Sequence, residues 1–499
     1  MRNTKIFRNK SIKEKLSQVY LNLSENRIFE KIASFRELKD VRNKQKRDAL
    51  EYYEKSKRPA GNDMGLHSFY LFEIFFSEDL SELGKILDNL FAKSSFSLTN
   101  ESFQSFLEEV SNRPGRAMCA LPLIVNKRTG FIPADRICID NMPAFIKCVE
   151  PKIIKILPSL VIMTMRVIID EELVNAKINQ VLEHGYQQRI IFHTYLPWRI
   201  SKSGMTLFPP HHEKSEACRN IMRHLKYETE CFIAKYFQGF YLSKKGGTNR
   251  CPSLDVYTIS QLPEEADIIN WAWSAQEYWR LVGFEYIYNK IWFKNNYGIF
   301  YYGSISEFPY VNKLLISESS VSGSESPGFG QSVQRIVSNT CEEFLFPMSL
   351  LGLFGELNEN IRKLKTVLFS YIKKRRGSRF RRLLRLQNLI SFISIKIDNV
   401  ISEYKKTPTD DRRDGNIEFK DLANQKTLSE AFSENIDYVI DDIKRILDPV
   451  EAYARDYFSN ENIRVNYLLQ KSIFILTVAI LFLTLLQFGP NMWSLIRVC

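Results

Sequence analysis

The chain lacks the residue patterns that mark most enzymes and metal sites. It contains no CxxC pair among its eight cysteines, and no HExxH, GxSxG or GxxxxGK[ST] segment. These absences exclude the common zinc-binding, metalloprotease, serine-hydrolase and P-loop signatures. The cysteine spacing also favours reduced, mostly buried thiols over disulfides. We therefore expect a non-enzymatic protein with no resident cofactor or metal.

An apolar secretory signal is missing at the start of the chain, and charge is missing near its end. The first residues, MRNTKIFRNKSIKEKL, are basic and polar, so no cleaved signal is visible. From Ser472 to Ile496 there is no Asp, Glu, Lys or Arg. About 20 apolar residues are enough to cross a bilayer as a helix, so this stretch predicts a transmembrane helix.

The cations that flank this span predict its orientation. Arg455, Arg464 and Lys471 precede it, whereas Arg497 follows it, and positive charge gathers on the cytoplasmic side. We therefore expect a single-pass, tail-anchored membrane protein whose N-terminal bulk is cytosolic. A buried core helix is the alternative.

The formal charge of +12 is concentrated in one segment. Its densest part carries eight cations without an acid, so its charges repel one another. The sequence predicts an anion site there, for phosphate or anionic lipid, with a solvated helix face as the alternative. Nucleic acid is disfavoured because no aromatic platform interleaves with the cations. The eight residues are Lys373, Lys374, Arg375, Arg376, Arg379, Arg381, Arg382 and Arg385.

Hydrophobic patterning predicts an α+β protein: a cytosolic α/β domain with an aromatic-rich sheet, a long helical stalk and one C-terminal transmembrane helix. Two segments, residues 67–91 and 160–183, read as a strand followed by an acidic helix start; an internal duplication is one explanation. The predicted parts are a helical N-terminal layer (1–64), the α/β domain (65–316), a Ser/Gly-rich linker (317–332), the helical stalk region (333–470, with a basic segment at 361–413) and the transmembrane helix (471–496).

An apolar stripe runs along the last long helix before the span. From Leu428 to Val450, apolar residues recur at three- and four-residue steps, and such a stripe needs a covering partner. A second copy of the chain and a neighbouring helix of the same chain both remain open. We expect Pro449 to kink or divide this helix.

Two weaker motifs have ordinary explanations. Ser326–Ser332 contains glycines that favour a phosphate loop at a helix start, but a plain linker fits better. The second motif is a group of His, Glu and Cys residues whose spacing matches no zinc site and suits capping or surface roles. Its members are His211, His212, Glu213, Cys218 and His224.

The segment SNENIRVNYLLQKSIFILTVAILFLTLLQFGPN resembles the end of the stalk helix and the first transmembrane helix of CorA-type divalent-cation channels. The matching positions are Asn466, Lys471 and Gly489, with Pro490-Asn491-Met492 in place of the family's intact Gly-Met-Asn. The order of a cytosolic α/β domain, long helices and then a membrane span is similar too. The resemblance implies a homo-oligomer whose cytosolic domain senses a ligand and controls a pore. Divergent CorA-like proteins also occur as antiviral membrane effectors beside type III CRISPR systems, where a nucleotide second messenger is thought to activate them.

The polar side chains of the span are the predicted pore or helix-packing residues: Thr477, Thr484, Gln487 and Asn491. The expected partners are membrane lipid, further copies of the chain and a nucleotide second messenger; a divalent cation is a second candidate ligand. Two alternatives to the pore remain. One is a tail-anchored, non-conducting scaffold or binding module, and the other is a membrane-tethered enzyme acting on a nucleotide or lipid.

Overall fold

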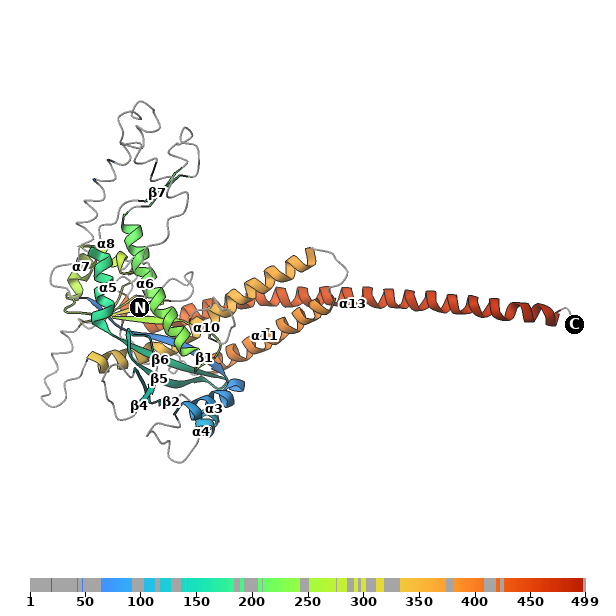
Figure 1. Ribbon diagram of the computed structural model, residues 1–499, viewed down its shortest axis with the longest axis horizontal. Helices are drawn as coiled ribbons and strands as arrows, with labels where there is room; N and C mark the ends of the chain where they lie inside the picture. Colours follow the sequence, from blue (N-terminus) through green and yellow to red (C-terminus); the bar gives the residue numbers. More distant parts are fainter. Residues whose placement is uncertain are drawn as a thin grey trace, which may run out of the picture. The chain divides into compact units, whose positions relative to one another are not determined.

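The computed structural model forms two compact units (Figure 1), Met1–Leu353 with Thr407–Asn435, and Phe354–Lys406 with Ile436–Cys499. We call them the sheet unit and the helical unit. The structure describes residues 19, 43, 47, 64–91, 103–112, 117–126, 136–139, 141–183, 189–192, 205–208, 210–242, 251–274, 276–284, 291–294, 298–301, 311–317, 333–373, 380–407, 419–421 and 426–496. The predicted N-terminal layer, apart from residues 19, 43, 47 and 64, lies outside the described residues, as do residues 318–332 of the linker.

An 11-stranded mixed sheet, counted over the described residues, organises the sheet unit. Its order is β13-β10-β11-β12-β9-β1-β6-β5-β3-β4, with β2 paired to β5. Most neighbours are antiparallel, but β12 runs parallel to β9 and β3 parallel to β4. The strands are β1 (Gly65–Phe76), β2 (Ala117–Ala120), β3 (Leu123–Asn126), β4 (Arg136–Ile139), β5 (Ile146–Leu157), β6 (Leu160–Ile169), β9 (Ser253–Ile259), β10 (Ile291–Lys294), β11 (Gly298–Tyr301), β12 (Val311–Ser317) and β13 (Lys420–Asp421). A separate pair joins β7 (Arg189–Phe192) to β8 (Met205–Phe208).

The central strands are long and buried on both faces. Every residue of β6 is buried, as is β1 apart from its two ends. Aromatic and β-branched residues fill both strands, which suits a pleated surface covered on each side. The helices of this unit are α3 (Leu80–Phe91), α4 (Phe103–Asn112), α5 (Glu171–Glu183), α6 (Pro210–Ile233), α7 (Ile268–Ser274) and α8 (Gln276–Leu281), with short 3-10 turns at Ser77–Asp79 and Glu265–Asp267.

Both predicted strand-then-helix segments are confirmed, as β1 with α3 and β6 with α5. The acids at the junctions cap the turns that follow. The Phe76 backbone N–H donates to Asp79 at 3.4 Å, and that of Leu173 donates to Asp170 at 3.3 Å. Side-chain oxygens at these positions satisfy amides that have no partner inside the helix. The two segments are also neighbours, because β1 and β6 pair antiparallel.

The long helices are α10 (Val333–Lys373), α11 (Phe380–Lys406) and α13 (Leu428–Ile496). α13 begins with a capping box: the Glu430 N–H donates to the Thr427 hydroxyl, and the Thr427 N–H donates to the Glu430 carboxylate. In the sheet unit, Phe344 of α10 stacks on Phe300 of β11, with 4.7 Å between ring centroids. Phe344 also contacts Phe432 in the first turns of α13.

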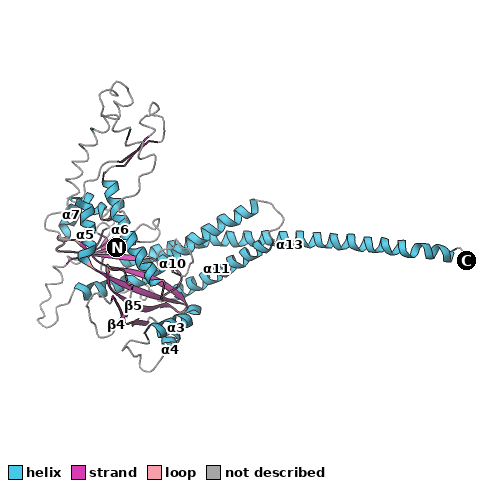
Figure 2. Cartoon of the chain, in the orientation of Figure 1, coloured by secondary structure: helices cyan, strands magenta, loops and turns pink. Residues whose placement is uncertain are grey.

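The described part of the helical unit contains helices only (Figure 2). Leu368 of α10, Ile390 of α11 and Val450 and Ala454 of α13 form one buried apolar cluster. The stripe of the last helix is thus covered within the chain at these positions. α13 is not divided at Pro449. A mixed α+β chain with a large sheet and a long C-terminal helix is confirmed.

Candidate functional site

α13 is apolar around its whole circumference from Ile473 to Leu481, where its described side chains end. Ile473, Phe474, Ile475 and Leu476 are 54%, 68%, 58% and 63% exposed. Successive helix residues are about 100° apart, so four in a row point to all sides. Of the described helices, this one is long and apolar enough to cross a membrane. A soluble helix of this length would turn one apolar face to a core and keep the other polar.

The described hydroxyls at the start of this apolar run bond within the helix. Thr477 donates to the Ile473 carbonyl and Ser472 donates to the Leu468 carbonyl, both at 2.9 Å. A hydroxyl bonded in this way avoids much of the desolvation cost of an apolar surrounding. Thr484, Gln487 and Asn491 lie further along α13, and their side chains are outside the described residues. The pore or packing role of all four stays a prediction.

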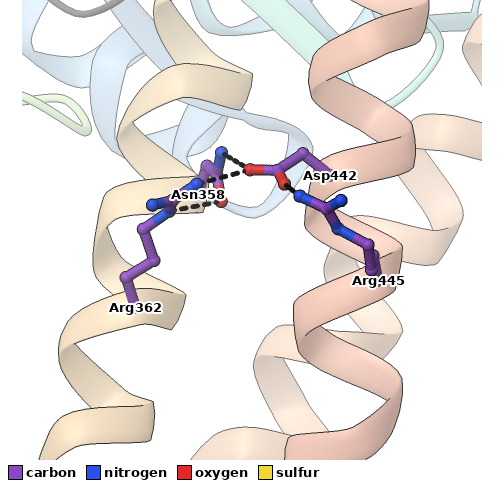
Figure 3. A network of polar contacts seen from close by, with 4 residues as sticks. All are labelled: Asn358, Arg362, Asp442 and Arg445. Atoms are coloured by element: carbon purple, nitrogen blue, oxygen red, sulfur yellow. Dashed lines mark hydrogen bonds and ion pairs between the residues drawn. The ribbon is translucent and has the colours of Figure 1, made fainter.

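A polar network, which we call the Asp442 lock, joins α10 to α13 (Figure 3). Asp442 has a side chain only 7% exposed. It accepts hydrogen bonds from Asn358 Nδ2 at 2.8 Å, Arg362 Nη2 at 2.7 Å and Arg445 Nη2 at 2.5 Å. Burial alone raises the pKa of Asp442, but these three donors outweigh it and lower the pKa to about 2.

A second polar contact holds α11 against α13. The Ser394 hydroxyl donates to Glu451 at 3.0 Å. On α10, the ring of Phe369 packs 5.3 Å from that of Tyr453. Together with the Asp442 lock, these contacts fix the register of the three helices. The sequence contained one signal for the lock, because Asp442 stands between Val439 and Ile443 inside the apolar stripe.

The structure places half of the predicted anion-site residues on helices. Lys373 is the last residue of α10, and Arg381, Arg382 and Arg385 lie in the first two turns of α11. The side chains of these four are outside the described residues. Lys374, Arg375, Arg376 and Arg379 lie outside them entirely.

Within the sheet unit, three buried basic side chains that sequence reasoning did not pair lie beside acids. Lys226 of α6 is 2.6 Å from Asp255 of β9. Arg166 of β6 is 3.0 Å from Glu150 of β5. The buried His67 is 2.7 Å from Glu171 at the start of α5. Buried charges are paired in stable folds, so the Lys226–Asp255 and Arg166–Glu150 contacts fit a structural role.

Glu73 is the most completely buried acid of the sheet unit, with no exposed surface. Its carboxylate accepts N–H groups of Ile74 at 2.9 Å and of Tyr241 and Leu242 at 2.8 Å. Burial raises the pKa of Glu73 to about 7, against the opposing effect of these donors. The segment after α6 lies so close that a Cβ at Gly239 would come within 2.5 Å of the Ile74 carbonyl.

The histidine-rich start of α6 makes helix-surface contacts. His212 lies 3.9 Å from Glu216, and His224 lies 3.0 Å from Glu228, each one turn further on. Among the residues that the structure describes, no three His, Cys, Asp or Glu side chains are arranged to hold a metal ion. Glu213 and Cys218 lie on the same helix.

No protein-family model, curated protein or solved structure matches the chain.

Proposed function

We propose that this chain is a membrane-anchored, homo-oligomeric protein whose sheet unit senses a ligand on the cytosolic side and controls a transmembrane pore. The observation that carries the anchor is the described apolar run of α13 from Ile473 to Leu481, which exposes apolar side chains in every direction. In water this surface would be strongly unfavourable, whereas hydrocarbon solvates it.

The flanking charges support a cytosolic location for the part of the chain that precedes the apolar run. Arg455, Arg464 and Lys471 lie on the N-terminal side of the apolar run. Cytoplasmic flanks carry the excess of Lys and Arg in membrane proteins. Arg455 and Arg464 are held on the helix surface by Glu451 and Glu461, at 3.0 and 3.3 Å.

Control of a pore needs several copies, because one helix cannot enclose a water-filled path. α13 supports such control because it is one uninterrupted helix. Its first turns belong to the sheet unit and its apolar end belongs to the helical unit. A ligand bound to the sheet unit would act on the same helix that enters the bilayer. The nucleotide ligand and a defence role rest on the resemblance to CorA-like proteins and stay predictions.

A non-conducting membrane scaffold is the second candidate, and one observation favours it. The Thr477 hydroxyl is already bonded to the Ile473 carbonyl, so it lacks a free donor to offer to water or an ion. A hydroxyl bonded within its own helix favours packing or anchoring over conduction.

Membrane insertion is tested by a matched pair of double variants on α13. Leu476→Asp with Ile480→Asp places acids inside the apolar run, and each acid opposes insertion by about 2.5 to 3.5 kcal/mol at a span centre. We expect alkaline carbonate to release this variant from membranes. Ile463→Asp with Leu468→Asp changes residues that are equally exposed but precede Lys471, so it stays bound. Release of the wild type under the same treatment would refute the anchor.

Oligomerisation and conduction are then tested on the full chain. Mass measurement in detergent separates a homo-oligomer from a monomer, and a strict monomer rules out a shared pore. Ion efflux from proteoliposomes separates the two candidates. Efflux supports the pore, whereas intact vesicles across a broad set of nucleotides and divalent cations support the scaffold.

Orientation is tested with native cysteines. Cys138 and Cys231 are exposed in the sheet unit. A membrane-impermeant maleimide is expected to label them in inside-out vesicles and to leave them unlabelled in intact cells. The opposite pattern would contradict a cytosolic sheet unit.

A further inference from the structure

The three helices of the helical unit have a register that the described contacts define. Along α10, Arg362 meets Asp442 and Phe369 meets Tyr453, so α10 runs parallel to α13. Between α10 and α11, the ring of Phe354 lies 6.4 Å from that of Tyr404, and Leu368 and Ile390 belong to one buried cluster with Val450 and Ala454. α10 and α11 therefore run in opposite directions, as two helices joined by a short connection require. Because α10 runs parallel to α13, α11 runs opposite to α13, and its Ser394 meets Glu451.

This register puts the basic ends of α10 and α11 at the same level of α13. Lys373 lies four residues beyond Phe369, which is about 6 Å along a helix and reaches the level of Tyr457. Arg381 lies nine residues before Ile390, which is about 14 Å and reaches the level of Glu461. Both ends therefore point toward the side on which the uncharged run of α13 begins.

The remaining distance to the membrane is short. From Glu461 to Ser472 is about 16 Å of helix, and a headgroup layer about 5 to 7 Å thick covers the hydrocarbon. The backbone of Arg381 therefore lies about 10 Å from the headgroups, which is close to the Debye length of about 8 Å at physiological salt.

The charges at this end are unbalanced. From Lys373 to Arg385 the sequence has eight cations and no acid. The first turn of α11 also carries no acid, and it holds Arg381 and Arg382. Cations at a helix N-terminus are unfavourable beside the positive end of the helix dipole. An anion from outside the chain would offset both effects.

We propose that this basic end of the α10–α11 hairpin binds the anionic headgroups of the bilayer that α13 enters. The inference rests on the proposed membrane insertion of α13 and adds a lipid partner to it. Anionic lipid is favoured over nucleic acid because the register holds the cations beside the membrane.

The test uses the full chain in nanodiscs of phosphatidylcholine, with or without phosphatidylglycerol. The readout is amide hydrogen exchange in peptides covering residues 372–387. We expect slower exchange in the phosphatidylglycerol discs and a smaller difference at high salt. An Arg or Lys near an anionic surface contributes roughly fivefold, so the double variant Arg381→Gln with Arg382→Gln should reduce the protection by up to about 30-fold.

A matched control sits at the other end of α11. Lys405→Gln with Lys406→Gln removes two exposed cations from the end remote from Ser472, and the protection should remain. Equal exchange in the two kinds of disc would overturn the inference, as would equal loss in both double variants. Protection of the same peptides by a single-stranded RNA in phosphatidylcholine discs, with none from phosphatidylglycerol, would assign the end to nucleic acid instead.

Failure of the proposed anchor has a different signature. A wild-type chain that does not enter either kind of disc would overturn the anchor and this inference together. A chain that enters both discs while showing no effect of phosphatidylglycerol leaves the anchor standing and removes only the lipid contact.

Discussion

Replacing Asp442 by Asn should loosen α10 from α13. The substitution keeps the size of the side chain but removes the charge that Asn358, Arg362 and Arg445 share. The pKa of Asp442 falls from its ordinary 3.8 to about 2, which corresponds to roughly 2 kcal/mol because one pKa unit is worth about 1.4 kcal/mol.

Solvent reduces this free-energy contribution. The side chains of Arg362 and Arg445 are 53% and 76% exposed, so water and salt screen part of the attraction. We therefore expect a loss of about 1 to 2 kcal/mol, which is roughly tenfold in an opening equilibrium. Hydrogen exchange of the α13 amides near Asp442 should accelerate by about that factor. Asp441→Asn is the matched control, because Asp441 is the exposed neighbour on the same helix.

The pH dependence gives a second, independent measurement. A carboxyl with a lowered pKa in the folded state adds stability above its unfolded value and loses it as the pH falls through the folded value. Protection near Asp442 should therefore decline between about pH 4 and 2 in the wild type, and this contribution should be missing from Asp442→Asn. The reasoning is refuted if Asp442→Asn exchanges at the wild-type rate, or if Asp441→Asn accelerates exchange equally.

Three further predictions concern the sheet unit. Glu73 has a pKa of about 7 when folded, against an ordinary 4.5, so its contribution favours folding most below pH 4.5 and is lost as the pH rises through 7. Denaturant unfolding should show a fall of about 3 kcal/mol over that range, and Glu73→Gln should abolish this dependence. Gly239→Ala should lower the melting temperature, because the added Cβ lies 2.5 Å from the Ile74 carbonyl and overpacking costs about 1 to 3 kcal/mol; an unchanged melting temperature would contradict that contact. Lys226→Met should destabilise the unit by about 3 to 5 kcal/mol through the unpaired Asp255, and adding Asp255→Leu should restore much of the loss; equal instability of both variants would argue against the buried pair.

Local sequence predicted the elements whose signals are local. The aromatic and β-branched run of β1 predicted a strand, Asp79 and Asp170 marked the turns that follow, and the absence of charge after Lys471 predicted the apolar end of α13. Pairings between distant residues could not be predicted, because no short pattern carries them. Asp442 and Arg362 are 80 positions apart, and one sequence offers many other cations to the same acid.

The candidate sites also differ in whether neighbouring residues or distant residues form them. Composition predicted the anchor and the basic segment, since both consist of neighbouring residues of one kind. The Asp442 lock and the Glu73 contacts were missed, because each joins one acid to donors elsewhere in the chain. An acid inside an apolar stripe or an aromatic run is the signal that should prompt a search for such donors.

The Asp442 lock also explains how the basic end of the hairpin keeps its distance from the bilayer. Apolar side chains such as Leu368 and Val450 have little directional preference, so apolar packing alone tolerates a slip of α10 along α13 by one turn, about 5.4 Å. The same slip would separate Asp442 from Asn358 and Arg362 and leave it only Arg445 of its own helix, at a cost of about 1 to 2 kcal/mol. A slip of that size is a large part of the roughly 10 Å between Arg381 and the headgroups. The lock therefore fixes the height of the cations above the lipid, and Asp442→Asn should weaken the protection of residues 372–387 in phosphatidylglycerol discs even though it removes none of those cations.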